Sequence, residues 1–149
     1  ALREAVRNAV QVGIHWGTAV VNKAHTVCQV FCSALPVAYA KSTPSADWTP
    51  FACLILEAAY TATLAAAAKL AHERQARVTV YLTSLGGGAF GNRQQWILEA
   101  MQSALLLWQH APLDVRLVHY MRPPKGMFDE LEARMAATTG KCGKSGSKP

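Results

Sequence analysis

Four glycines and an asparagine gather in residues 80–101, VYLTSLGGGAFGNRQQWILEAM. The segment has the pattern of an apolar strand, a glycine-rich turn and an amphipathic helix. Glycine reaches backbone conformations with positive φ and lets a ligand come close to the main chain. The helix that follows points unpaired N–H groups and the positive end of its dipole at the turn. This arrangement predicts a site where main-chain N–H groups hold a phosphate or another anion.

A purely structural interpretation of the turn stays open beside the anion site. The glycines would then only make a tight turn against a neighbouring helix. Three consecutive glycines exceed what a turn alone requires, which favours an anion held by the amides between Leu85 and Asn92. Arg93 stands next to the turn and is a candidate to pair with a phosphate.

Two common nucleotide-binding loops do not fit this turn. The Walker pattern requires Lys and Ser or Thr after its last glycine, whereas Asn and Arg follow Gly91. The GxGxxG spacing is present, but a dinucleotide-binding unit also needs an acidic residue at the end of the next strand. The only acid there, Asp114, stands at the start of its strand. Hydrolysis of the P-loop type and nicotinamide chemistry are therefore disfavoured.

The rest of the chain alternates between strand and helix patterns. Long helices between apolar strands predict an α/β fold, with a mostly parallel sheet covered by helices on both faces. The expected elements are a helix over 2–14, a short strand over 18–21, a strand buried on both faces over 26–39, a helix over 50–74 capped by Thr49, a buried strand over 76–83, a helix over 93–110, a strand over 111–120 and a helix over 126–140.

Three loops should meet at one edge of the predicted sheet. In parallel sheets, ligands bind at the carboxyl ends of the strands. The loops over residues 35–45, 84–92 and 120–125 each follow a predicted strand, so they should converge on one crevice. His119, Ser33 and Tyr39 stand at a similar level, and His119 is a candidate ligand contact.

Residues 26–120 resemble the macro domain, the α/β module that binds ADP-ribose. The stretch LILEAAYTATLAAAAKLA is similar to a macro-domain helix with an AY…L…A core. VTVYLTSLGGGAFGN is similar to its strand and loop of the form S-T-G-[IV]-[FY]-G, in which the backbone wraps the diphosphate and the aromatic packs near the distal ribose. The resemblance implies a three-layer sandwich and the ligand-loop residues Gly87, Gly88, Ala89, Phe90 and Gly91. With the flanking Gly86 and Asn92 these form the predicted ligand-binding set, and no cofactor is expected.

The sequence departs from the macro-domain pattern at several positions. Gly86 and Gly87 replace Ser-Thr, and Asn92 replaces an aromatic residue. Nothing in residues 1–25 matches the earlier glycine-rich loop with its asparagine, so the domain has diverged or lacks its N-terminal part. No catalytic residue is carried over. The sequence therefore predicts binding of ADP-ribose or a related nucleotide diphosphate, and the alternatives are an ADP-ribosyl hydrolase on the same fold or a non-binding interaction protein.

Length and charge indicate the domain organisation of the chain and the kind of partner it binds. Its 149 residues predict a single macro-like domain over residues 1–140, followed by a basic flexible tail over 141–149. The net charge is +6, which favours anionic partners, and the three lysines of the tail could serve that contact. No uninterrupted apolar run reaches the length of roughly 18 residues that a membrane span needs, so no membrane partner is expected.

Four cysteines occur without the spacing of a metal site. Cys28 and Cys32 lie four residues apart in an extended segment, about 13 Å from one another, which is too far for a disulfide. Reduced thiols of this kind are typical of an intracellular protein. No metal site is predicted, and the sequence does not fix the oligomeric state.

Overall fold

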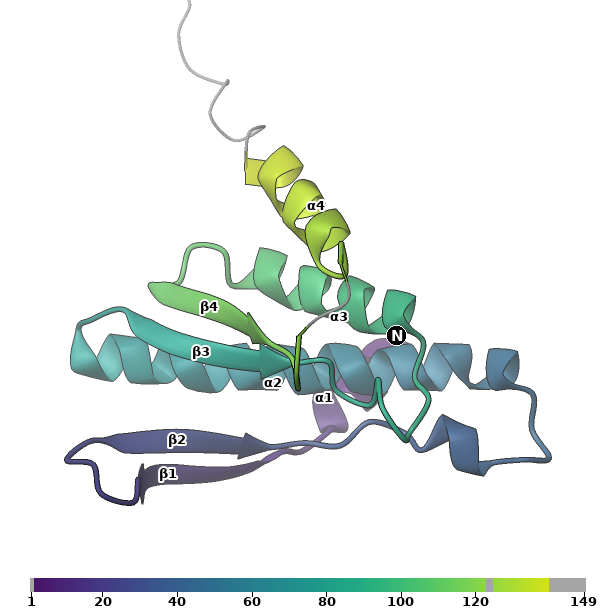
Figure 1. Cartoon of the computed structure of the whole chain (residues 1–149), viewed down its shortest axis with the longest axis horizontal. Coiled ribbons are helices and arrows are strands. Elements are labelled where there is room, and N and C mark those ends of the chain that lie inside the picture. Colours follow the sequence, from purple (N-terminus) through teal and green to yellow (C-terminus); the bar gives the residue numbers. More distant parts are fainter. Residues whose placement is uncertain (1, 123–124, 140–149) are drawn as a thin grey trace, which may run out of the picture.

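The computed structural model describes residues 2–122 and 125–139 as four α-helices and four strands (Figure 1). The expected tail over 141–149 and the end of the last helix at Gly140 lie outside these residues. In chain order the elements are α1 (Leu2–Ala9), β1 (Gly13–Ala19), β2 (Thr26–Phe31), the 3-10 turns η1 (Val37–Tyr39) and η2 (Ser45–Trp48), α2 (Thr49–Arg74), β3 (Val78–Thr83), α3 (Gln94–Leu107), β4 (Leu113–Val118) and α4 (Asp129–Thr139).

The four strands form two separate pairs. β1 and β2 are antiparallel, with a register shift between His15 and Thr18, whereas β3 and β4 are parallel from Val78↔Leu113 to Thr83↔Val118. The α/β class and a parallel strand pair joined by a helix are thus confirmed. The expected mostly parallel sheet is found only in β3 and β4, because the described residues hold two small sheets in place of one.

The N-terminal third differs most from the sequence-based expectation. The helix expected over 2–14 ends at Ala9, and the short strand expected over 18–21 is the longer β1, which starts at Gly13. Pairing with β2 overrides the helical pattern there, since tertiary contacts decide weak local preferences. The strand expected over 26–39 ends at Phe31, and Pro36, which cannot donate a ladder hydrogen bond, precedes the η1 turn.

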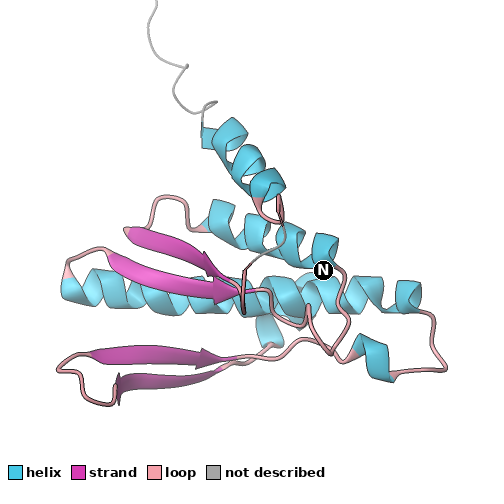
Figure 2. Ribbon diagram, in the orientation of Figure 1, coloured by secondary structure: helices cyan, strands magenta, loops and turns pink. Residues whose placement is uncertain are grey.

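Only one face of the β3–β4 pair is covered in the described residues. In β3, Val80 and Leu82 are buried in the core, while Tyr81 on the opposite face is exposed. The two long helices α2 and α3 pack against each other, and in Figure 2 α2 passes behind β3 while α3 runs beside β4. In β2, Phe31 is also exposed. The expectation of strands buried on both faces is therefore wrong for this part of the chain.

Helix α2 is the centre of the core. It begins at Thr49, with Pro50 in its first turn, and ends at Arg74, followed by Gln75 in a left-handed conformation. The expected cap by Thr49 is wrong, because its hydroxyl donates back to the Ala46 carbonyl (2.7 Å) and caps no helix N–H group. The helix is apolar on nearly every side, as buried core helices and membrane spans both are. By length and composition alone the helical stretch Ser45–Arg74 could cross a membrane, and half of its most apolar part is buried within this fold.

Truncating the core side of α2 should destabilise the protein strongly. Leu56 is fully buried, whereas Leu107 on α3 is 65% exposed. We expect Leu56→Ala to lower the free energy of unfolding by about 2–5 kcal/mol, because it leaves a cavity that the surroundings fill only in part. Leu107→Ala, the matched control, should change it by no more than about 0.5 kcal/mol. Urea denaturation followed by circular dichroism measures both, and equal losses would contradict the assignment of α2 as the core helix.

Candidate functional site

Two of the loop glycines are required by the fold itself. Gly86 and Gly91 have φ values of +74° and +68°. A Cβ added at Gly86 would lie 2.4 Å from the Cβ of Ala34, and one added at Gly91 would lie 2.8 Å from the Cβ of Ala38. The structural interpretation of the glycine turn therefore holds for these two positions, because they let the loop after β3 pack closely on the loop after β2.

Gly88 has no comparable structural reason to be glycine. A Cβ added there meets no heavy atom within 4 Å, and its φ is not in the left-handed region. Gly87 is intermediate, since a Cβ would lie 3.1 Å from Cδ1 of Ile97. The space above Gly88 is thus open, and a side chain there would occupy it without disturbing the protein.

The main-chain N–H groups of the loop fall into two sets. The first set is bonded within the protein: Leu85 donates to Thr83, Gly87 to Ser84, Gly91 to Gly88 and Asn92 to Gly86, at 2.9–3.0 Å. The second set has no hydrogen-bond acceptor among the described residues: Gly86, Gly88, Ala89 and Phe90. The expected cradle is therefore narrower than the whole span from Leu85 to Asn92. Its free donors are concentrated in the consecutive amides of Gly88, Ala89 and Phe90.

Asn92 holds the loop from inside. Its side chain is only 5% exposed, and Nδ2 donates to the carbonyl oxygens of Leu35 (2.8 Å) and Gly86 (3.3 Å). Its Oδ1 is buried without a hydrogen-bond partner in the described residues. The Asn92 side chain thus positions the loop. In the predicted ligand binding it could act only as a hydrogen-bond acceptor, through Oδ1.

The loops after β2 and β3 meet as the sequence predicts. The Ala38 N–H donates to the Phe90 carbonyl (3.0 Å), and the Tyr39 ring lies edge-on to the Phe90 ring, with centroids 5.7 Å apart. The third expected partner, the loop over residues 120–125, makes no hydrogen bond to either loop among the described residues, and its Tyr120 is 91% exposed. Convergence is therefore confirmed for two of the three loops.

Tyr60 on α2 supports the start of the loop, and sequence reasoning did not single it out. Its hydroxyl donates to the Thr83 carbonyl (2.7 Å) and accepts from the Leu85 N–H (2.9 Å). Burial of the ring raises the pKa of this hydroxyl well above its usual value. The only available signal was a tyrosine in an alanine-rich core helix, because a buried hydroxyl needs a polar partner.

Several polar groups around the loop lack partners. Ser84 Oγ at the start of the loop, Gln94 Nε2 in the first turn of α3 and His119 Nδ1 just after β4 are buried without a hydrogen bond in the described residues. The Arg93 guanidinium lies over the Trp96 ring, 5.1 Å from its centroid, and the Arg93 side chain is exposed at the start of α3. Arg93 is therefore positioned beside the loop with its charge accessible to solvent.

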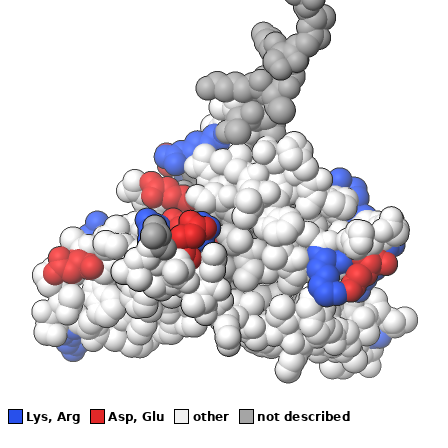
Figure 3. Space-filling model, turned by 180° about the vertical axis from the view of Figure 1, so that it is seen from behind, with Lys and Arg blue, Asp and Glu red and all other residues white. Residues whose placement is uncertain are grey.

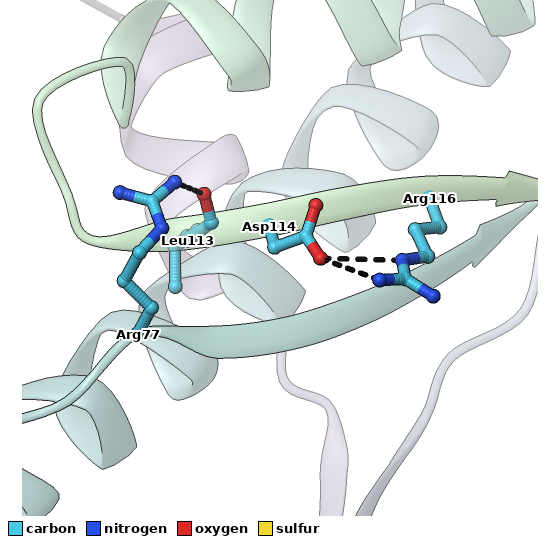
Figure 4. Close-up of polar contacts among 4 residues, drawn as sticks. All are labelled: Arg77, Leu113, Asp114 and Arg116. Carbon is cyan, nitrogen blue, oxygen red and sulfur yellow. Dashed lines mark hydrogen bonds and ion pairs between the residues drawn. The ribbon is translucent and has the colours of Figure 1, made fainter.

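Neither the charged side chains on the face seen in Figure 3 nor the metal-ligating side chains of the described residues form a comparable site. Seen from behind, Lys and Arg alternate with Asp and Glu in small clusters, and no continuous basic patch covers this face (Figure 3). Asp114 pairs with Arg116 on β4 (2.9 Å; Figure 4), so it is occupied at a distance from the loop. Residues 2–122 and 125–139 contain no group of three His, Cys, Asp or Glu side chains suited to a metal.

Comparison of the chain with protein-family models, with curated proteins and with solved structures finds no match. The resemblance to the macro domain therefore stays a prediction from the loop and helix motifs.

The two kinds of loop glycine should respond differently to alanine. Gly86→Ala forces a Cβ against Ala34 and keeps a left-handed φ, so we expect a loss of about 1–3 kcal/mol or more in the free energy of unfolding. Gly88→Ala places its methyl group in open space and should be neutral to within about 0.5 kcal/mol. Thermal and urea denaturation test the pair, and a destabilising Gly88→Ala would show that this position is structural too.

Tyr60 should give the protein a distinct instability in alkali. Because the folded pKa of Tyr60 is raised, its contribution is complete below the unfolded pKa of about 10 and is lost above it, where only the unfolded chain ionises. Tyr60→Phe should cost about 1–3 kcal/mol at neutral pH, since it leaves the Leu85 N–H without its Tyr60 acceptor. The stability difference between the two proteins should then shrink by up to about 1.4 kcal/mol per pH unit above pH 10. A difference that stays constant from pH 8 to 11 would contradict the pKa shift.

Proposed function

We propose that the chain binds the diphosphate of ADP-ribose, or of a related nucleotide, on the loop between β3 and α3. The observation that carries the proposal is the run of three consecutive amides, Gly88, Ala89 and Phe90, that have no acceptor among the described residues. Open space above Gly88 lets a phosphate approach them. Successive main-chain N–H groups in a turn form a concavity suited to anions.

The surroundings of these amides support a phosphorylated ligand. The first turn of α3, which begins at Gln94, follows directly, and the N-terminus of a helix favours negative charge. Arg93 supplies a full positive charge beside the same loop. A diphosphate thus meets both neutral donors and a cation.

The aromatic pair at the loop supports a nucleotide over a bare phosphate. Tyr39 and Phe90 come from the two loops that meet here, and Tyr39 is largely exposed while Phe90 is half-buried. Rings in this position offer an apolar surface for a ribose or a base next to the phosphate-binding amides. This matches the macro-domain resemblance, in which the aromatic of the loop packs near the distal ribose.

The same proposal includes a macro-domain-like three-layer sandwich. The unit β3–loop–α3–β4, with its parallel strands and connecting helix, supports it. In a three-layer sandwich a second layer of helices covers the other face of the sheet. In the described residues that face of β3 is exposed.

Binding without hydrolysis is the function that these residues support. Residues 86–92 contain no acid, base or nucleophile, and the nearest candidates are the Ser84 hydroxyl and His119. Hydrolysis of an ADP-ribosyl bond needs a general base or a group that positions water. A protein that binds no nucleotide at all, and acts through protein contacts, is the remaining alternative.

Blocking the space above Gly88 should abolish binding and leave the fold intact. We expect isothermal titration of the wild-type protein with ADP-ribose to give a saturable heat, and Gly88→Val to weaken the affinity about 100-fold or more, because the branched side chain covers the amides. Ser103→Val, an exposed substitution on α3, is the matched control and should bind as the wild type does.

One further ligand and one further variant sharpen the titration. Adenosine, which lacks the diphosphate, should bind far more weakly than ADP-ribose, and Arg93→Gln should lower ADP-ribose affinity about tenfold. No heat and no thermal shift with millimolar ADP-ribose would refute the proposal and favour the interaction protein. Full affinity in Gly88→Val would place any nucleotide site elsewhere.

A further inference from the structure

A groove of about 380 Å³ separates the two sheets. β2 forms one wall and β3 the other, and side chains of α2 form the floor. β2 and β3 point the same way in Figure 1, and α2 passes behind β3. The lining residues from the strands are Thr26, Val27, Cys28, Val30, Val78, Thr79, Val80 and Tyr81. The glycine loop is not among them, so the groove is distinct from the proposed nucleotide site.

Each wall of the groove is the edge of a sheet. β2 pairs with β1 alone and β3 with β4 alone in the described residues, so each strand keeps one edge without a strand partner. The lining residues are consecutive along β3, from Val78 to Tyr81. A strand face contributes alternate residues, whereas an edge contributes consecutive ones. Two unpaired rows of N–H and C=O groups therefore face the same groove, which is the feature that natural edge strands usually conceal.

The floor and the ends of the groove limit what can enter it. Thr63, Ala66 and Ala67 are small, so the floor leaves room for larger apolar side chains from above. Toward the carboxyl ends of the strands the loops close together, through the Asn92–Leu35 hydrogen bond. Toward the amino ends the groove is lined by Arg74 and Arg77.

The end of the groove near the amino ends of the strands is lined by arginines, whereas its other lining residues are uncharged. Arg77 stands just before β3 and lines the same end, but its guanidinium turns toward β4 and donates to the Leu113 carbonyl (Figure 4). Arg74 is exposed at the end of α2 and forms no ion pair among the described residues. The exposed Arg74 guanidinium at this end favours a carboxylate there.

We propose that this groove binds an extended segment of a partner protein as an added β-strand, with apolar side chains toward α2 and an acidic residue at the Arg74 and Arg77 end. The segment would be about four or five residues long, matching the walls at roughly 3.3 Å per residue. It would hydrogen-bond to the edges of both β2 and β3 and join the two sheets into one. Main-chain bonds would supply affinity, and the alternate apolar side chains and the acidic residue would supply specificity. This inference does not depend on the nucleotide site.

Cys28 reports occupancy of the groove directly. It lines the groove as a free thiol, whereas Cys53 on α2 is a free thiol that does not. Burial raises the pKa of both thiols, so the alkylation rate of each is compared with and without peptide at one pH. The probes are two capped peptides of alternating valine and threonine, one with aspartate first and one with aspartate last, because the direction of the added strand is open.

At millimolar peptide, one of the two probes should slow the alkylation of Cys28 about tenfold and leave Cys53 unchanged, as measured by mass spectrometry of the full chain. The same peptide with N-methyl groups on alternate residues cannot pair with both edges and should not protect Cys28. Protection by the N-methylated peptide to the same extent, or no protection by either probe, would overturn the proposal.

A charge exchange tests the recognition of the acidic residue. Arg74→Glu should weaken the aspartate probe about threefold and strengthen a lysine-ended version by a similar factor, as an exposed ion pair would. Lys69→Glu, which lies on α2 outside the groove lining, is the matched control and should change neither affinity. Protection of Cys28 that grows with protein concentration in the absence of peptide would show that a second copy of the chain fills the groove, against the partner proposed.

Discussion

The side-chain amide of Asn92 joins the two halves of the molecule at the point where both sheets end. Its Nδ2 bonds to Leu35 from the β2 side and to Gly86 from the β3 side, in a buried position where an unmade hydrogen bond would cost free energy. This bridge draws the loops together, and Gly86 and Gly91 permit the contact because any Cβ would collide with Ala34 or Ala38. The bridge fixes the glycine loop in the conformation that leaves its amides open, and it closes one end of the groove.

Helix α2 supplies the common support for both candidate sites. Tyr60 near its middle holds Thr83 and Leu85 at the start of the glycine loop, while Thr63 and Ala67 one and two turns later form the floor of the groove. The small residues Thr63, Ala66 and Ala67 leave open space above this floor. One helix therefore sets the positions of the phosphate-binding amides and of the two sheet edges.

The glycine loop shows how far sequence reasoning reached. The strand, the turn and the helix around it were predicted correctly because apolar alternation and the glycine cluster are local signals. Which amides are free was not predictable, since this depends on the acceptors that the fold brings near each N–H. Half of the expected donors are bonded inside the loop, and Tyr60 takes part from a position 25 residues earlier in the chain.

The sequence by itself determined the α/β class, the long core helix, the strand–loop–helix unit and the meeting of the loops after two strands, because each depends on periodicity and on residues with special backbone freedom. Only the tertiary structure decided that residues 13–19 pair as a strand, that the sheets stay separate in the described residues and that two edges face one groove. The physical reason is that strand pairing joins residues distant in sequence. Such pairing depends on which backbone partners are within reach, and local pattern carries no record of them.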